Sequence, residues 1–120
     1  MTTFHAHITI VNNTSDVFTL DTSASSGINT HGYSFPTQLN ANSTTGPFEQ
    51  GFDLQINFTA VYVDTTSTAS PQPQVALHMY GDGAQVFTVQ IKQTPSSPQP
   101  FPASTCDATG STSATFTIAN

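Results

Sequence analysis

Apolar and polar residues alternate along several separate stretches of this chain, as they do in β-strands with one buried face. The longest such stretch runs from Phe52 to Val63, where every second residue from Phe52 to Tyr62 is apolar. A helix would scatter these apolar residues around its surface. A second alternation covers Phe4 to Val11. The pattern therefore predicts strands, and no stretch favours a helix.

Seven strands are expected from these alternations and from the turn-forming residues between them. They are residues 4–11, 17–20, 35–39, 52–63, 74–80, 85–93 and 114–118. Three segments are expected to be loops: residues 21–34, 64–73 and 94–113. The Asp82-Gly83 pair, flanked by two strands, predicts a β-hairpin. We expect an all-β fold, an antiparallel two-sheet β-sandwich of about seven or eight strands, in one domain spanning residues 1–120.

Charge is scarce in this chain, and positive charge is scarcer still. Only 7% of the residues are charged, Lys92 is the only Lys or Arg, and the formal net charge is −6. Nucleic acids, polyphosphates and acidic membranes are bound mainly through Arg and Lys. We therefore exclude these three classes of partner. Few charges also oppose self-association, so we expect a homo-oligomer.

The single cysteine, Cys106, cannot form an internal disulfide, and no base or positive charge near it in sequence predicts a catalytic thiol. The sequence begins without the basic and apolar segments of a signal peptide. A cytoplasmic protein or one exported without such a signal fits equally, and the compartment stays open.

No catalytic motif of high specificity is present. The Gly-x-Ser-x-Gly motif is missing, and nothing indicates that Glu49 and Asp53 form a carboxylate pair in a cleft. We expect a protein that is not an enzyme and uses no cofactor.

His5 and His7 are the strongest candidates for metal ligands. They lie two residues apart on one expected strand, so both point to the same face, and His31 or His78 could supply a third nitrogen. Paired histidines on a solvated strand are, however, more often ordinary surface residues. We expect no metal, with His5 and His7 as the pair to examine.

Three residues are predicted to contact a ligand: Tyr33, Tyr80 and Asp82. Tyr33 lies in the long early loop, and Tyr80 adjoins the expected hairpin turn that contains Asp82. Tyrosine rings can stack on a sugar or enclose a choline group, and loops on a rigid β-scaffold commonly bind ligands. Tyr62 is expected in the core instead.

The first half of the chain resembles the aegerolysin and actinoporin-like β-sandwich proteins, many of them fungal. The stretches that carry the resemblance are Ile8 to Thr14, Phe18 and Leu20, Pro36 to Phe48, and Leu54 to Asp64. The resemblance implies a membrane-lipid-binding or cytolytic sandwich. Those families usually carry several tryptophans, whereas this chain has none, so no binding residue is carried over.

A recognition protein that binds neutral glycans through loops at one end of the sandwich is the function we expect. Asn, Asp, Thr and Gln supply hydrogen bonds to sugar hydroxyls, and Tyr supplies a stacking face. One alternative is a cytolysin-like protein that binds zwitterionic lipid head groups, which the missing Trp and basic residues disfavour. The other is a structural β-protein that assembles through its sheets.

Overall fold

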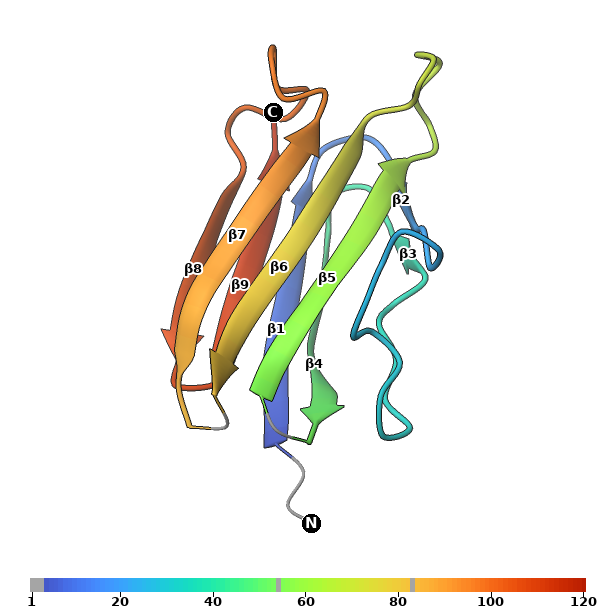
Figure 1. The fold of residues 1–120 in the computed structure, drawn as a ribbon. Helices are drawn as coiled ribbons and strands as arrows, with labels where there is room; N and C mark the ends of the chain where they lie inside the picture. The colour runs from blue at the N-terminus through green and yellow to red at the C-terminus, as the bar shows by residue number, and fades with distance from the viewer. Residues whose placement is uncertain (1–3, 54, 83) are drawn as a thin grey trace.

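The computed structural model describes residues 4–53, 55–82 and 84–120, and within them the fold is all-β (Figure 1). The described strands are β1 (Phe4–Asn13), β2 (Phe18–Leu20), β3 (Gln38–Leu39), β4 (Ser43–Phe52), β5 (Gln55–Asp64), β6 (Gln74–Asp82), β7 (Val86–Thr94), β8 (Thr105–Gly110) and β9 (Ser113–Ala119). One sheet has the order β4-β1-β9-β8 and the other has the order β3-β2-β5-β6-β7. The predicted two-sheet β-sandwich is confirmed, with nine described strands in place of seven or eight.

The core lies between the two sheets and is built from the inward positions of the alternating strands. On β1 and β5 every second side chain is buried, as the sequence predicts. The fully or almost fully buried residues of the three longest apolar strands are Ala6, Ile8 and Ile10 on β1, Ile56, Phe58, Ala60 and Tyr62 on β5, and Val75, Leu77 and Met79 on β6.

Phe58 lies at the centre of this core and contacts three other rings. Its ring centroid is 4.7 Å from that of Phe35, 6.4 Å from that of Phe52 and 6.2 Å from that of Phe116. Phe35 belongs to the loop between β2 and β3, Phe52 to β4 and Phe116 to β9. One residue of β5 therefore packs against both the other sheet and this loop.

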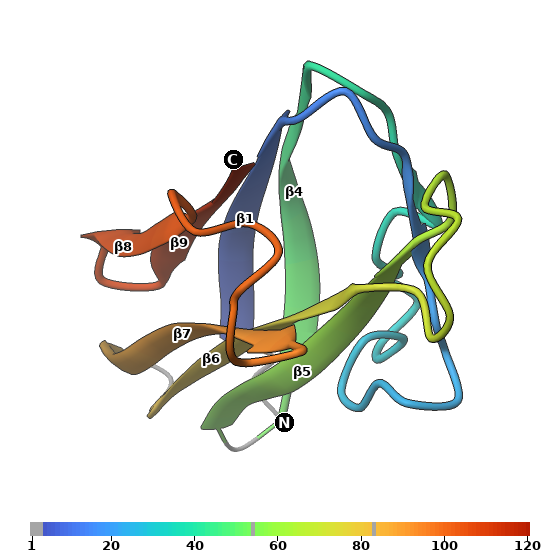
Figure 2. The same cartoon turned by 90° about the horizontal axis from the view of Figure 1, so that it is seen from above.

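Two connections cross side by side from one sheet to the other, β1 to β2 and β3 to β4 (Figure 2). Asn12 joins them, because its Nδ2 donates to the carbonyl oxygens of Asp16 at 2.8 Å and Asn40 at 2.9 Å. The backbone N–H of Asn42 also donates to the carbonyl of Thr14 at 2.9 Å.

The expectation of a wholly antiparallel sandwich is wrong at one pair of strands. β1 and β9 pair in parallel, from His7 opposite Ser113 to Asn13 opposite Ala119. Side chains alternate with the same period in parallel and antiparallel strands, so the sequence pattern does not distinguish them.

Two strands, β4 and β8, were not predicted, since no strand was expected at residues 43–51 or at residues 105–110. β8 lies within residues 94–113, which were expected to be a loop, because it is an edge strand whose side chains are mostly exposed and show no apolar alternation. The expected strand from Phe52 to Val63 is divided, with Phe52 ending β4 and Gln55 beginning β5. Leu54 and Gly83 lie outside the described residues. No helix long and apolar enough to cross a membrane occurs in the described ranges.

Candidate functional site

The outward face of β5, β6 and β7 carries the side chains that best suit ligand binding. Strand pairing places Tyr80 of β6 between Asn57 of β5 and Thr88 of β7. The next row along the same face places His78 between Thr59 and Gln90. The intervening residues of β6, such as Met79, point into the core.

Tyr80 and Phe87 form an exposed aromatic pair on this face. Among the described residues they are the two large side chains with apolar rings that are exposed, Tyr80 at 37% and Phe87 at 59%, and their ring centroids are 6.2 Å apart with the planes at 45°. Exposed aromatic rings that lie side by side offer a stacking surface to a ligand. We call these two residues the aromatic pair.

A β-bulge places Phe87 beside Tyr80. Tyr80 pairs with Thr88 but the next residue, Gly81, pairs with Val86, so β7 carries one extra residue at Phe87. Gly81 is required here because a Cβ would lie 2.3 Å from the carbonyl oxygen of Gln85. The bulge therefore turns Phe87 outward while Val86 packs against the core.

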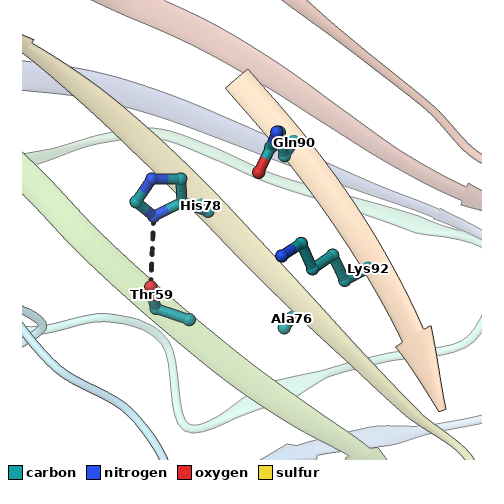
Figure 3. Close-up of a pocket in the computed structure, with 5 residues that line it drawn as sticks. All are labelled: Thr59, Ala76, His78, Gln90 and Lys92. Atoms are coloured by element: carbon teal, nitrogen blue, oxygen red, sulfur yellow. Dashed lines mark hydrogen bonds between the residues drawn. The ribbon is translucent and has the colours of Figure 1, made fainter. Parts of the chain in front are cut away.

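A polar pocket lies next to the aromatic pair on the same face (Figure 3). It has a volume of about 240 Å³. Its lining residues are Thr59 of β5, Ala76 and His78 of β6, and Gln90 and Lys92 of β7. We call these five residues the polar pocket. Four of the five lining residues carry a polar group, a hydroxyl, an imidazole, an amide and an ammonium, and Ala76 completes the lining.

The orientation of His78 is fixed by its neighbours on β5. Its Nδ1 lies 2.9 Å from the carbonyl oxygen of Phe58 and 3.1 Å from Oγ1 of Thr59. Because a carbonyl oxygen only accepts hydrogen bonds, we assign the hydrogen to Nδ1. Nε2 of His78 is then an acceptor, on the side of the ring away from Thr59 (Figure 3).

Asp82, a predicted ligand contact, closes the hairpin turn. Its Oδ1 accepts hydrogen bonds from the backbone N–H groups of Ala84 and Gln85, both at 2.8 Å. This is the usual way in which Asp stabilises a turn. The predicted hairpin of β6 and β7 is confirmed, and Tyr80 lies two residues from Asp82 on the same strand face.

Tyr33, another predicted contact, lies elsewhere in the molecule. Its ring packs edge-on against His5 of β1, with centroids 5.3 Å apart and planes at 73°. His5 and His7 face the same carboxylate, with Nδ1 of His5 3.2 Å from Oε2 of Glu49 and Nδ1 of His7 3.5 Å from Oε1. We call these four residues the histidine cluster. Tyr33 contacts the four-stranded sheet and Tyr80 belongs to the five-stranded sheet, so the structure does not bring the two tyrosines into one site.

The predicted common face of His5 and His7 is confirmed, but neither proposed third histidine joins them. Nε2 of His31 lies 2.8 Å from Oδ1 of Asp53, and His78 belongs to the polar pocket. Among the residues that the structure describes, no group of three or more His, Cys, Asp and Glu side chains is arranged to hold a metal ion.

Cys106 of β8 is half-buried, and burial raises the pKa of its thiol above the ordinary value. The nearby charge of Asp107 acts in the same direction. The thiol donates a hydrogen bond to the carbonyl oxygen of Val89 at 3.4 Å. A reactive cysteine needs a lowered pKa, so these contacts do not favour nucleophilic chemistry at Cys106.

Tyr80 was predicted from the sequence as a ligand contact, whereas its neighbours Phe87, Gln90 and Lys92 were not. An unbroken alternation along residues 85–93 places Phe87 on the same face as Val89, which packs against the core. The bulge reverses that assignment, and no turn-forming residue at this point of β7 indicates a bulge. Gln90 and Lys92 could have been found from the hairpin register, since both lie outward and opposite β6.

Comparison of the chain with protein-family models, curated proteins and solved structures gives no match. The resemblance to aegerolysin and actinoporin-like proteins stays a prediction. Functional conclusions about this chain therefore depend on the geometry of its side chains.

Proposed function

We propose that this chain is a recognition protein, not an enzyme, and that it binds neutral glycans on the outward face of β5, β6 and β7. The observation that carries the proposal is the aromatic pair, in which Tyr80 and Phe87 lie exposed and adjacent on a rigid sheet. The apolar faces of sugar rings stack on such surfaces. From the sequence, the glycan site was expected at loops at one end of the sandwich. We propose instead that it lies on the sheet face near the β6–β7 turn.

Polar groups suited to sugar hydroxyls surround the aromatic pair. Gln55 and Asn57 are exposed on the same face of β5, and the hydroxyl of Tyr80 lies 3.4 Å from Oε1 of Gln55. Gln90 and Thr59 follow in the next row. Amide and hydroxyl groups both donate and accept, as a sugar hydroxyl does, so they can satisfy a neutral ligand without charge.

The proposal is tested by applying the fluorescently labelled protein to an array of immobilised neutral oligosaccharides. The double variant Tyr80→Ala/Phe87→Ala is expected to lose roughly tenfold or more in affinity, because each stacking ring contributes about 0.5–1.5 kcal/mol. Both side chains lie outside the core, so the double variant should still fold, and circular dichroism checks that it does. Tyr33→Ala is the matched control and should keep full binding.

Two results would contradict this assignment. Full binding by the double variant would remove the aromatic pair from the site, and loss with Tyr33→Ala would move the site to the histidine cluster. Failure to bind any glycan, together with binding to phosphatidylcholine vesicles, would replace the glycan proposal with the lipid-binding alternative.

A further inference from the structure

We propose that the polar pocket binds a carboxylate, and that the protein recognises a glycan in which an acidic sugar residue adjoins the neutral residue stacked on the aromatic pair. This inference rests on the proposed glycan-binding function and extends it from neutral glycans to glycans that carry one acidic residue beside a neutral one. Its basis is the position of Lys92, the only Lys or Arg of the chain.

Lys92 is the only Lys or Arg in 120 residues, in a chain with a formal net charge of −6. It lines the polar pocket, and Figure 3 shows its side chain extending from β7 toward β6. The ion pairs found among the described residues all join histidines to Glu49 or Asp53, so Lys92 is in none of them. Its ammonium group is therefore available to a bound anion.

Other groups of the pocket can complete the contacts to a carboxylate. The amide of Gln90 and the hydroxyl of Thr59 can donate hydrogen bonds to its oxygens. Nε2 of His78 can accept a hydrogen bond from a hydroxyl on the same sugar ring. Charge-assisted hydrogen bonds of the ammonium to the carboxylate are stronger than those between neutral groups.

The charge balance selects a ligand with a single carboxylate over a polyanion. Polyanions such as nucleic acids or sulfated chains require several cations in the site, whereas this pocket holds one. The remaining surface of the protein is acidic and repels additional negative charge. One ammonium beside neutral donors matches one carboxylate.

The spacing on β6 fits two neighbouring sugar residues. His78 and Tyr80 are two residues apart on one face, which corresponds to about 7 Å along a strand. Lys92 lies opposite Ala76, two residues farther along β6, and its long side chain lines the pocket together with His78. A glycan whose neutral residue stacks on the aromatic pair can therefore place its next residue over the polar pocket.

The experiment compares binding to uronic-acid and sialic-acid oligosaccharides with binding to the same oligosaccharides after chemical reduction of the carboxyl group to an alcohol. The unaltered protein should bind the acidic forms about two- to fivefold more tightly, as expected for an exposed ion pair. Lys92→Met keeps the apolar stem, removes the charge, and should bind the acidic and the reduced forms with equal affinity. Lys92→Arg should keep the preference.

Thr44→Glu serves as the matched charge control. It lowers the net charge by one, as Lys92→Met does, but lies exposed on β4 of the other sheet, so it should keep the preference for the acidic forms. Equal binding of acidic and reduced forms by the unaltered protein would overturn the carboxylate proposal and leave glycan binding intact. Binding of neither form, nor of any neutral glycan, would overturn both proposals.

Discussion

Tyr62 connects the early loop to the core through one hydrogen bond. Its side chain is fully buried, and its hydroxyl donates to the carbonyl oxygen of Pro36 at 2.7 Å. Burial also raises the pKa of this hydroxyl, so it stays protonated in the folded protein. Sequence alternation placed Tyr62 in the core, but the partner of its hydroxyl depends on a loop whose path no periodicity predicts.

Removing that hydroxyl should destabilise the protein. Tyr62→Phe leaves the ring in place and the carbonyl of Pro36 without its partner, so we expect a loss of about 1–2 kcal/mol in the free energy of unfolding. Urea unfolding followed by circular dichroism measures this loss. Tyr33→Phe is the control and should change the free energy by less than about 0.5 kcal/mol. Equal stability of Tyr62→Phe and the unaltered protein would contradict the assigned hydrogen bond.

Asp16 and Asp64 form a pair of neighbouring carboxyl groups. A hydrogen bond with Asp64, followed by burial and by the charge of Asp64, raises the pKa of Asp16 above its ordinary value of 3.8. The folded state therefore holds this proton more tightly than the unfolded state does. Through this group, stability must fall as the pH rises from 3.8 to the raised pKa.

Asp16→Asn should remove the loss of stability that Asp16 causes as the pH rises. We expect the variant to have a higher melting temperature than the unaltered protein at pH 7 and a smaller difference below pH 4. Thermal melts between pH 3 and pH 7 measure it. Asp21→Asn is the contrasting control, because hydrogen bonds from Ser23 lower the pKa of Asp21, so its loss should lower stability at neutral pH. A melting temperature of Asp16→Asn below that of the unaltered protein at pH 7 would contradict the raised pKa.

At the scale of elements, the loop between β2 and β3 is fastened to β5. Ser26 and Thr59 exchange two backbone hydrogen bonds of 2.9 Å, and the next residue, Gly27, has a φ of +70°. A Cβ on Gly27 would lie 2.3 Å from the backbone oxygen of Asn57. Gly32 in the same loop has a φ of +79° but no atom within 4 Å of the equivalent position.

Variants of these two glycines distinguish the cost of backbone strain from the cost of steric overlap. Gly32→Ala should cost about 1–2 kcal/mol, from the positive φ alone. Gly27→Ala meets the same strain and also pushes the loop away from β5, so it should cost more than Gly32→Ala by at least about 1 kcal/mol. Chemical unfolding of both variants measures the difference. Equal losses would mean that the loop does not pack on β5 at Gly27.

The elements found from sequence are those with one buried and one exposed face. β1, β5, β6 and β9 alternate cleanly, so their existence and inward residues followed from the pattern. β8 has no such alternation because it is an exposed edge, and β4 has polar Gln50 buried between Phe48 and Phe52. For the site, Tyr80 was recognisable as an aromatic residue beside a turn. Phe87 was not, because its outward position depends on a bulge.

At the scale of the whole molecule, the edge strand β8 has few charges to prevent it from pairing with another chain. β8 exposes Thr105, Asp107 and Ala108 and carries no lysine. Proteins commonly use charged residues, lysine above all, to prevent edge strands from pairing with other chains. We therefore expect self-association through β8, in keeping with the homo-oligomer predicted from the sequence.

Sedimentation velocity at increasing protein concentration tests this expectation. The unaltered protein should form dimers or larger species, and Ala108→Lys on β8 should shift it toward monomer. Ser15→Lys places the same charge on an exposed turn and should leave the distribution unchanged. A chain that stays monomeric at every concentration would rule out assembly through the β8 edge.

A glycan is proposed to bind on the outward face of β5, β6 and β7. This binding site can be mapped by titrating the ¹⁵N-labelled protein with the glycan that binds most strongly on the array and following backbone amide shifts by NMR. We expect the largest shifts at His78, Tyr80, Phe87 and Gln90, with small ones at His5 and Tyr33. Largest shifts at the histidine cluster, with none along β6 and β7, would contradict it.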